Sequence, residues 1–173
     1  MKKTLSILLA LTLLVLPFVA FADYAKMSDD ELYAELNLIR AELTKRAAEK
    51  EGKQVLAEAD GITVTYKGDP TWKENYDGTH LIVLNVTVVN DSKNAVGIRQ
   101  DDSYVNGWKI SCSFQTSLEP GMKTKDTIVF YKVDEDGDLE SLEDLEDIKI
   151  TFLTFDANSF KTKTKNISTT ITF

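Results

Sequence analysis

The residues best suited to chemistry are acidic side chains in the second half of the chain. Asp134, Asp136 and Asp138 alternate within one short segment. Calcium binds several oxygen ligands at once, and alternating aspartates can supply them from a single loop. The match to an EF-hand-type calcium loop is partial, because Leu139 stands where glycine is needed and Leu145 where glutamate is needed. Calcium binding is therefore a remote alternative to a solvated crossover whose leucines pack on the edge of the fold.

The single cysteine, Cys112, and the single histidine, His80, offer little for zinc or nucleophilic chemistry. A zinc site needs several His or Cys ligands, and a catalytic histidine needs a nucleophile and an orienting carboxylate. Cys112 falls on the apolar face of its predicted strand, which favours a buried and unreactive thiol. Asp101 and Asp102 are adjacent, so their side chains point to opposite faces of a strand rather than to one glycosidic bond. We expect neither a cofactor nor an enzymatic activity.

Three aromatic residues are the candidate ligand contacts. Trp72 and Tyr76 lie in the long irregular segment 69–78 among polar residues, and Tyr104 lies beside a predicted turn. Aromatic rings next to polar groups are typical of surfaces that contact proteins or carbohydrates. The alternative for Trp72 is that its ring covers one end of the core.

The net charge of the chain argues against some kinds of binding partner. The chain has 173 residues, with 20 Lys and Arg against 28 Asp and Glu, which gives a formal net charge of −8. Segment 1–22 contains two lysines and no acid, so its removal would give 18 − 28 = −10. Nucleic acids and anionic lipids both reward clustered basic residues. We therefore expect no nucleic-acid partner and no direct adsorption to a membrane.

Residues 1–22 have the pattern of a secretory signal peptide. Lys2 and Lys3 precede an apolar run, Pro17 interrupts it, and small residues stand at the positions expected before a cut after Ala22. The alternative is an uncleaved anchor, since the apolar run is close to the minimum span of about 17 residues. The prediction is a secreted protein, released or retained at the cell envelope.

Residues 23–58 are predicted to form an amphipathic helix, over 29–51, and a linker. Ser28 and Glu31 have the spacing of a capping box, and Gly52 is a stop signal. The apolar stripe consists of Leu32, Leu36, Ile39 and Leu43. Such a stripe needs a partner, because an isolated helix of this length is marginal in water. Three partners remain open: the β-domain, the same helix of another chain, or none if the segment is a loose spacer.

Residues 59–173 are predicted to form an antiparallel β-sandwich of about seven strands. Apolar and polar residues alternate in several short runs that turn signals separate. Asn106-Gly107 predicts a two-residue turn that places Val105 opposite Trp108. The predicted core comprises Ile62, Val64, Ile82, Leu84, Val86, Val88, Trp108, Ile110, Phe114, Ile128, Phe130, Ile148, Ile150 and Phe152.

Five sequence pieces, in order, resemble a group of immunoglobulin-like domains of unknown function in secreted proteins and lipoproteins of Gram-positive bacteria. They are DGITVTYKG, VTVVNDSKNAVGI, SYVNGW, SLEPGMKTKDTIVF and LEDIKITFLTFDANSF. The resemblance covers nearly all of residues 59–173, and the helical segment before them resembles elements that precede such domains. It implies an immunoglobulin-like fold and an exported location. It assigns no catalytic residues, and no cysteine suited to lipid attachment follows the signal segment.

Together these features predict an exported, non-catalytic binding module whose partner is a protein or a cell-envelope glycan. The first alternative is a structural accessory domain that self-associates through its 29–51 helix. The remote alternative is a calcium-responsive module that uses Asp134, Asp136 and Asp138.

Overall fold

The structure is a computed structural model that describes residues 28, 31, 32, 36, 39, 42, 43 and 46 and residues 52–173. The chain divides into two compact units, Met1–Leu43 and Thr44–Phe173. The predicted signal segment 1–22 lies outside the described residues. Among the residues that are described, no helix is long and apolar enough to cross a membrane.

The capping box predicted at Ser28 is present. The Ser28 N–H and Oγ–H both donate to Glu31 Oε2 at 2.8 Å, and the Glu31 N–H donates to Ser28 Oγ at 3.4 Å. The described residues that follow have helical backbone: Glu31, Leu32, Leu36, Ile39, Glu42, Leu43 and Arg46. The rest of the 29–51 helix lies outside the described residues, so the helix as a whole stays a prediction.

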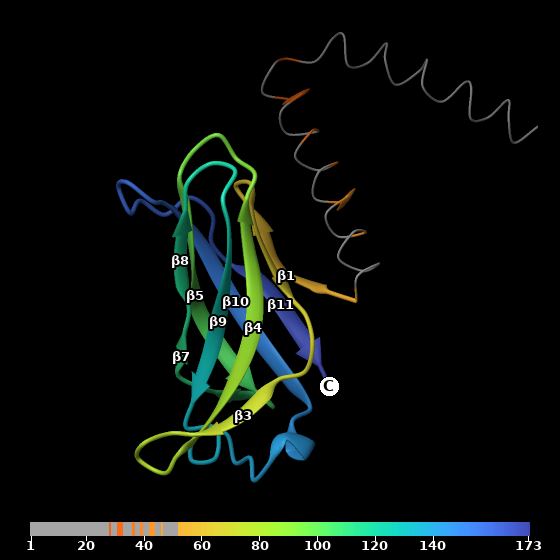
Figure 1. The fold of residues 1–173 in the computed structure, drawn as a ribbon, viewed down its shortest axis with the longest axis vertical. Coiled ribbons are helices and arrows are strands. Elements are labelled where there is room, and N and C mark those ends of the chain that lie inside the picture. Colours follow the sequence, from red (N-terminus) through yellow and green to blue (C-terminus); the bar gives the residue numbers. More distant parts are fainter. Residues whose placement is uncertain are drawn as a thin grey trace, which may run out of the picture. The chain divides into compact units, whose positions relative to one another are not determined.

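Residues 52–173 form two antiparallel sheets, as predicted, but with eleven strands rather than about seven (Figure 1). The two sheets enclose one hydrophobic core. The six-stranded sheet runs in the order β1 (Gln54–Ala59), β2 (Ile62–Tyr66), β4 (His80–Asn90), β9 (Lys123–Tyr131) and β7 (Cys112–Ser113), with β3 (Thr71–Glu74) paired to β4. The five-stranded sheet runs in the order β11 (Ile167–Thr172), β10 (Asp147–Asp156), β5 (Val96–Val105) and β6 (Trp108–Lys109), with β8 (Gln115–Leu118) also paired to β5. A short 3₁₀ helix, η1 (Leu142–Asp144), lies between β9 and β10.

Strand β1 begins before residue 59, the start predicted for the β-domain. It pairs with β2 from Gln54 opposite Tyr66 to Ala59 opposite Ile62, and Leu56 and Ala57 are buried. A bulge between Val55 and Ala57 breaks the regular register. The bulge also breaks the period-two pattern, which is the signal that sequence reasoning uses to recognise a strand.

The turn predicted at Asn106-Gly107 is confirmed. The two residues have φ values of 47° and 81°, and a type I′ turn needs positive φ at both central positions. Val105 pairs with Trp108 as predicted. The side chain of Asn106 also fixes the end of the acidic crossover, which is the segment 134–147 that leads from β9 to β10. Its Oδ1 accepts from the N–H groups of Glu146 and Asp147 at 2.9 and 3.1 Å.

The predicted core is buried with one exception. Trp108 is 57% exposed, although Val105 across the turn is fully buried. The chain leaves the five-stranded sheet after Lys109 and joins the other sheet at Cys112. Side chains alternate between the two faces of a sheet only along one continuous strand. The burial of Ile110 therefore does not imply that Trp108, two residues earlier, is buried as well.

Gln100 holds this crossing between the sheets. Its side-chain amide donates to the carbonyl oxygen of Cys112 at 2.7 Å and accepts from the N–H of Phe114 at 3.1 Å. Ser103 adds a hydrogen bond from its hydroxyl to the carbonyl oxygen of Ile110 at 2.6 Å. Side chains thus provide hydrogen bonds to backbone groups in the segment where the chain crosses from one sheet to the other.

Candidate functional site

Trp72, His80 and Asp134 form a cluster where β3 meets the start of β4. The Trp72 ring stacks on the His80 ring, with centroids 5.0 Å apart and planes at 23°. His80 Nδ1 lies 2.8 Å from Asp134 Oδ2, and the His80 N–H donates to Asp134 Oδ1 at 2.8 Å. Burial raises the pKa of Asp134, but the hydrogen bonds from the His80 side chain and backbone outweigh it and leave that pKa below its ordinary value.

The contacts of this cluster join the start of β4 to the segment that follows β9. A His–Asp pair becomes catalytic when a hydroxyl or thiol bonds to the imidazole, and in the described part of the chain the His80 side chain bonds only to Asp134. Trp72 is half-buried and packs against the core. This agrees with the alternative interpretation given above, in which its ring covers one end of the core. The cluster fixes the first residue of β4 and, with it, the end of the loop that precedes this strand.

Tyr76 lies in that loop and is 98% exposed. The loop backbone is held on both sides of it: the Asn75 N–H donates to the Thr79 carbonyl at 2.7 Å, and the Gly78 N–H donates to the Asn75 carbonyl at 3.1 Å. The Thr79 hydroxyl donates to Asp77 Oδ1 at 2.6 Å, and hydrogen bonds from Thr79 place the pKa of Asp77 below its ordinary value. A fixed backbone therefore presents a fully solvated ring.

Tyr104 belongs to the other sheet, so the structure does not bring the three predicted ligand residues into one site. It lies on β5 between Lys109 of β6 and Lys149 of β10. The Lys149 ammonium is 6.0 Å from the centre of the Tyr104 ring, and Lys109 pairs with Asp102 at 2.6 Å. Tyr104 thus lies among charged side chains on the surface of the five-stranded sheet, away from Trp72 and Tyr76.

Within residues 52–173, the acidic side chains of the crossover are not grouped in a metal-binding arrangement. The Asp134 carboxylate is already hydrogen-bonded to His80, and within residues 52–173 no three acidic, His or Cys side chains are grouped to hold a metal ion. Leu139 and Leu145 are buried and Leu142 packs against the core, as the reading of a solvated crossover predicted.

Cys112 is half-buried, and burial raises the pKa of its thiol to about 12. A hydrogen bond with the Ser103 side chain lowers that pKa in part. The reactive species is the thiolate, which is negligible at neutral pH when the pKa is this high. The residue therefore behaves as a core thiol.

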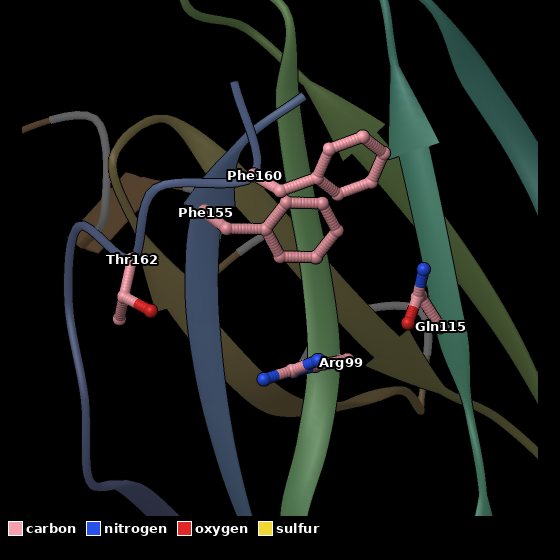
Figure 2. A pocket seen from close by; sticks show the side chains of 5 residues that line it. All are labelled: Arg99, Gln115, Phe155, Phe160 and Thr162. Carbon is pink, nitrogen blue, oxygen red and sulfur yellow. The ribbon is translucent and has the colours of Figure 1, made fainter. Parts of the chain in front are cut away.

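The sequence did not reveal a shallow hollow on the outer face of the five-stranded sheet. Ile98 points into the core, so its neighbours Gly97 and Arg99 point outward. The hollow encloses about 230 Å³, part of which is open to solvent. Figure 2 shows the side chains around it, which are Arg99, Gln115, Phe155, Phe160 and Thr162.

Two stacked phenylalanines form one side of this hollow. The Phe155 ring lies over Gly97, where an added Cβ would come within 2.2 Å of it, so glycine makes room for the ring. Phe155 is 3% exposed, and Phe160, whose ring stacks on it at a centroid distance of 5.7 Å, is 69% exposed. The segment DANSFKTKTKN contains the signal that was missed: an aromatic residue directly after a turn and beside alternating lysines.

The loop from Asp156 to Phe160 holds the exposed ring in place. Asp156 Oδ1 accepts from the N–H groups of Asn158 and Ser159 at 3.0 and 2.8 Å, and the Phe160 N–H donates to the Asp156 carbonyl at 2.7 Å. The hydrogen bonds from Ser159 lower the pKa of Asp156. Phe160 itself has a φ of 57°, which is unusual for a bulky residue.

No protein-family model and no curated protein matches this chain. Among solved structures, a FixG-related protein from Vibrio parahaemolyticus is similar at 13% identity, over 66% of this chain and 97% of its own, with a TM-score of 0.36. A protein from Archaeoglobus fulgidus is similar at 12% identity, over 62% of this chain and 97% of its own, with a TM-score of 0.35. Similarity at this level carries no functional argument, so function is inferred from the residues themselves.

Proposed function

We propose that this protein is an exported, non-catalytic binding module with an immunoglobulin-like sandwich and an amino-terminal amphipathic helix. The signal-like segment 1–22, the order of the sequence pieces that resemble Gram-positive immunoglobulin-like domains, and the two antiparallel sheets support this proposal. Its partner is a protein or glycan of the cell envelope.

The exposure of Tyr76 carries the proposal. The ring contributes nothing to the core, because 98% of the residue is exposed. The Trp72–His80–Asp134 cluster and the hydrogen bonds of Asn75 and Thr79 fix the loop around it. A ring whose backbone is ordered before binding loses less conformational entropy when it contacts a partner. Aromatic side chains in such positions are often the energetic centres of interfaces.

The test compares Tyr76→Ala with Tyr76→Phe in binding to whole cells of the source organism and to a glycan array. We expect Tyr76→Ala to weaken binding at least about tenfold and Tyr76→Phe to retain most of it, because the ring supplies the contact area. Both variants should unfold at the wild-type midpoint, since the side chain is solvated in the free protein. Wild-type binding by Tyr76→Ala would exclude this loop as the contact surface.

Trp72→Ala is a poor probe of binding, because its loss would remove a ring that packs on the core and on His80. We expect it to destabilise the domain, by about 2 kcal/mol for a partly buried aromatic ring. Binding by this variant therefore has to be compared at equal fractions of folded protein.

A second candidate function is self-association through the amino-terminal segment. Leu36, Ile39 and Leu43 have helical backbone and are 39%, 45% and 60% exposed. Their spacing places them on one helical face. An exposed apolar stripe of this kind fits the same stripe of a second chain, and the association state of the protein tests it.

A further inference from the structure

We propose that the hollow formed by Arg99, Gln115, Phe155, Phe160 and Thr162 binds one acidic sugar unit of a polysaccharide. The sugar ring lies against Phe160, and its carboxylate pairs with the Arg99 guanidinium. This site is distinct from the Tyr76 loop, so it adds a second contact to the binding module.

The two sites lie at opposite ends of the sandwich. The Tyr76 loop leads into His80, the first residue of β4. The last residue of β4, Asn90, donates from its side chain to the Leu118 carbonyl at 2.8 Å, and Leu118 pairs with Val96 at the start of β5. The hollow is built around Gly97 at that same end. Substitutions at one site therefore leave the other intact.

The polar groups of the hollow are available to a ligand. Within residues 52–173, no hydrogen bond or ion pair involves the Arg99 guanidinium, the Gln115 amide or the Thr162 hydroxyl. Arg99 and Gln115 are cross-strand partners on β5 and β8, so their side chains share one face. Figure 2 shows both beside the two phenyl rings. A guanidinium has several donors in one plane, which suits a carboxylate, whereas amide and hydroxyl groups suit sugar hydroxyls.

The charge around the hollow is opposite to that of the chain. The segment 156–166 contains Lys161, Lys163 and Lys165, all exposed, and a single acid, Asp156. With Arg99 this gives four positive charges against two negative ones, because the Asp60 carboxylate accepts from the Thr164 hydroxyl, in a chain of formal net charge −8. A local positive potential in an acidic protein attracts anionic ligands to one place and repels them elsewhere.

The geometry favours a sugar over a simple anion. One face of Phe160 stacks on Phe155, and the residue as a whole is 69% exposed. The C–H groups on one face of a pyranose ring carry partial positive charge, so they pack well on the negative face of a phenyl ring. The hollow is shallow and partly open to solvent, so it suits contact with a single ring unit of a longer chain that continues into solvent.

Calorimetric titration of the full chain with a tetramer of galacturonic acid tests the proposal, with the methyl ester of the same tetramer as the matched neutral probe. We expect the acid to bind and the ester to bind at least about tenfold more weakly, because the ester removes the charge-assisted bond to Arg99. Arg99→Gln should weaken binding of the acid by a similar factor and leave binding of the ester unchanged.

Phe160→Gly tests the stacking contact at a position whose backbone suits glycine. Glycine accepts the φ of 57° without strain, which offsets part of the stability lost with the Phe155 stack, so the variant should remain folded while its binding of the acid falls about tenfold. Tyr76→Ala is the control at the other site and should bind the acid normally.

The proposal is overturned if the acid does not bind at millimolar concentration, or if acid and ester bind equally. Equal binding of a glycerol-phosphate oligomer would also overturn it, since the surface would then select charge alone. Loss of tetramer binding in Tyr76→Ala but not in Arg99→Gln would reject the hollow and leave the Tyr76 proposal standing.

Discussion

The hydroxyl of Tyr66 is buried and has no hydrogen-bond partner among the described residues. Burial, with a smaller contribution from Asp69, raises its pKa to about 12. A buried hydroxyl without a partner has lost its hydrogen bonds to water, and no hydrogen bond within the protein replaces them. We expect Tyr66→Phe to raise the free energy of unfolding by about 1 kcal/mol, as measured by urea denaturation. A decrease of that size would show that the hydroxyl is hydrogen-bonded in solution.

Glu58 connects stability to pH. Burial, and then the nearby charge of Asp91, raise the pKa of Glu58 above its ordinary value of 4.5. The folded state therefore favours the neutral carboxyl of Glu58. The contribution of Glu58 to the free energy of unfolding is fully present at low pH, and it is lost as pH rises from 4.5 through the raised pKa. We expect Glu58→Gln to gain about 0.5 kcal/mol over the wild type at neutral pH and to lose this advantage below pH 4.5.

Asp91→Asn is the matched control, since it removes the second charge of the pair. It should give a smaller gain, because Glu58 stays buried, and the double variant should gain less than the sum of the two. A gain from Glu58→Gln that is the same at every pH would contradict an electrostatic cause. Melting temperatures measured across this pH range provide the comparison.

Single residues show which structural features the sequence pattern predicts correctly and which it does not. Alternation identified the inward residues of β4 and β9 correctly, because those strands run without interruption. It failed at Trp108, where the chain changes sheets. It also could not place His80 beside Asp134, since residues 54 positions apart meet only through the fold.

At the scale of elements, the turn at Asn106 determines how the acidic crossover ends. The Asn106 side chain accepts from Glu146 and Asp147 and donates to the Asp144 carbonyl at 2.7 Å. We expect Asn106→Gly to keep the turn, because glycine accepts positive φ, but to lose about 2 kcal/mol with these three bonds. Guanidinium denaturation measures the loss.

Asn106→Asp separates the donated bond from the accepted bonds. Aspartate can still accept from Glu146 and Asp147, but it cannot donate to the Asp144 carbonyl and it brings a negative charge among several acids. It should therefore destabilise the domain, and added salt should recover part of the loss. Wild-type stability in both variants would mean that the crossover is held elsewhere.

The elements explain what the sequence could reveal of the two candidate sites. The Tyr76 loop was visible, because aromatic and polar residues gather between two predicted strands, although the segment predicted to be irregular in fact contains strand β3 (Thr71–Glu74). The hollow was not, because Gly97, Arg99 and Gln115 come from strands β5 and β8 and meet Phe155 only through sheet pairing. Each residue taken alone is an ordinary strand position.

At the scale of the molecule, the position of β1 determines where the chain can be shortened. A truncation at residue 57 would remove half of β1 together with the buried Leu56. We expect residues 52–173 to fold alone and to unfold in a single transition, because they contain both sheets and the whole core. Calorimetry and denaturant titration should give coincident transitions, and separate transitions would contradict a single cooperative unit.

Light scattering of residues 23–173 and 52–173 decides between the two functional candidates. If Leu36, Ile39 and Leu43 pair between chains, the longer form should have twice the monomer mass and the shorter form should be monomeric. A monomeric mass for both would exclude self-association through this segment and leave the binding module.

The passage of the chain from β6 through β7 to β8 has a consequence for solubility. Exposed strand edges are templates on which other chains add and aggregate. On this side of the sandwich the edge strands contain only two, two and four residues, because the chain divides them between the sheets. On the other side the Gln54 side chain of β1 donates to the Thr170 carbonyl of β11 at 3.2 Å, so the two edges lie together. A domain with such short or mutually covered edges can remain dispersed at high concentration without a disulfide.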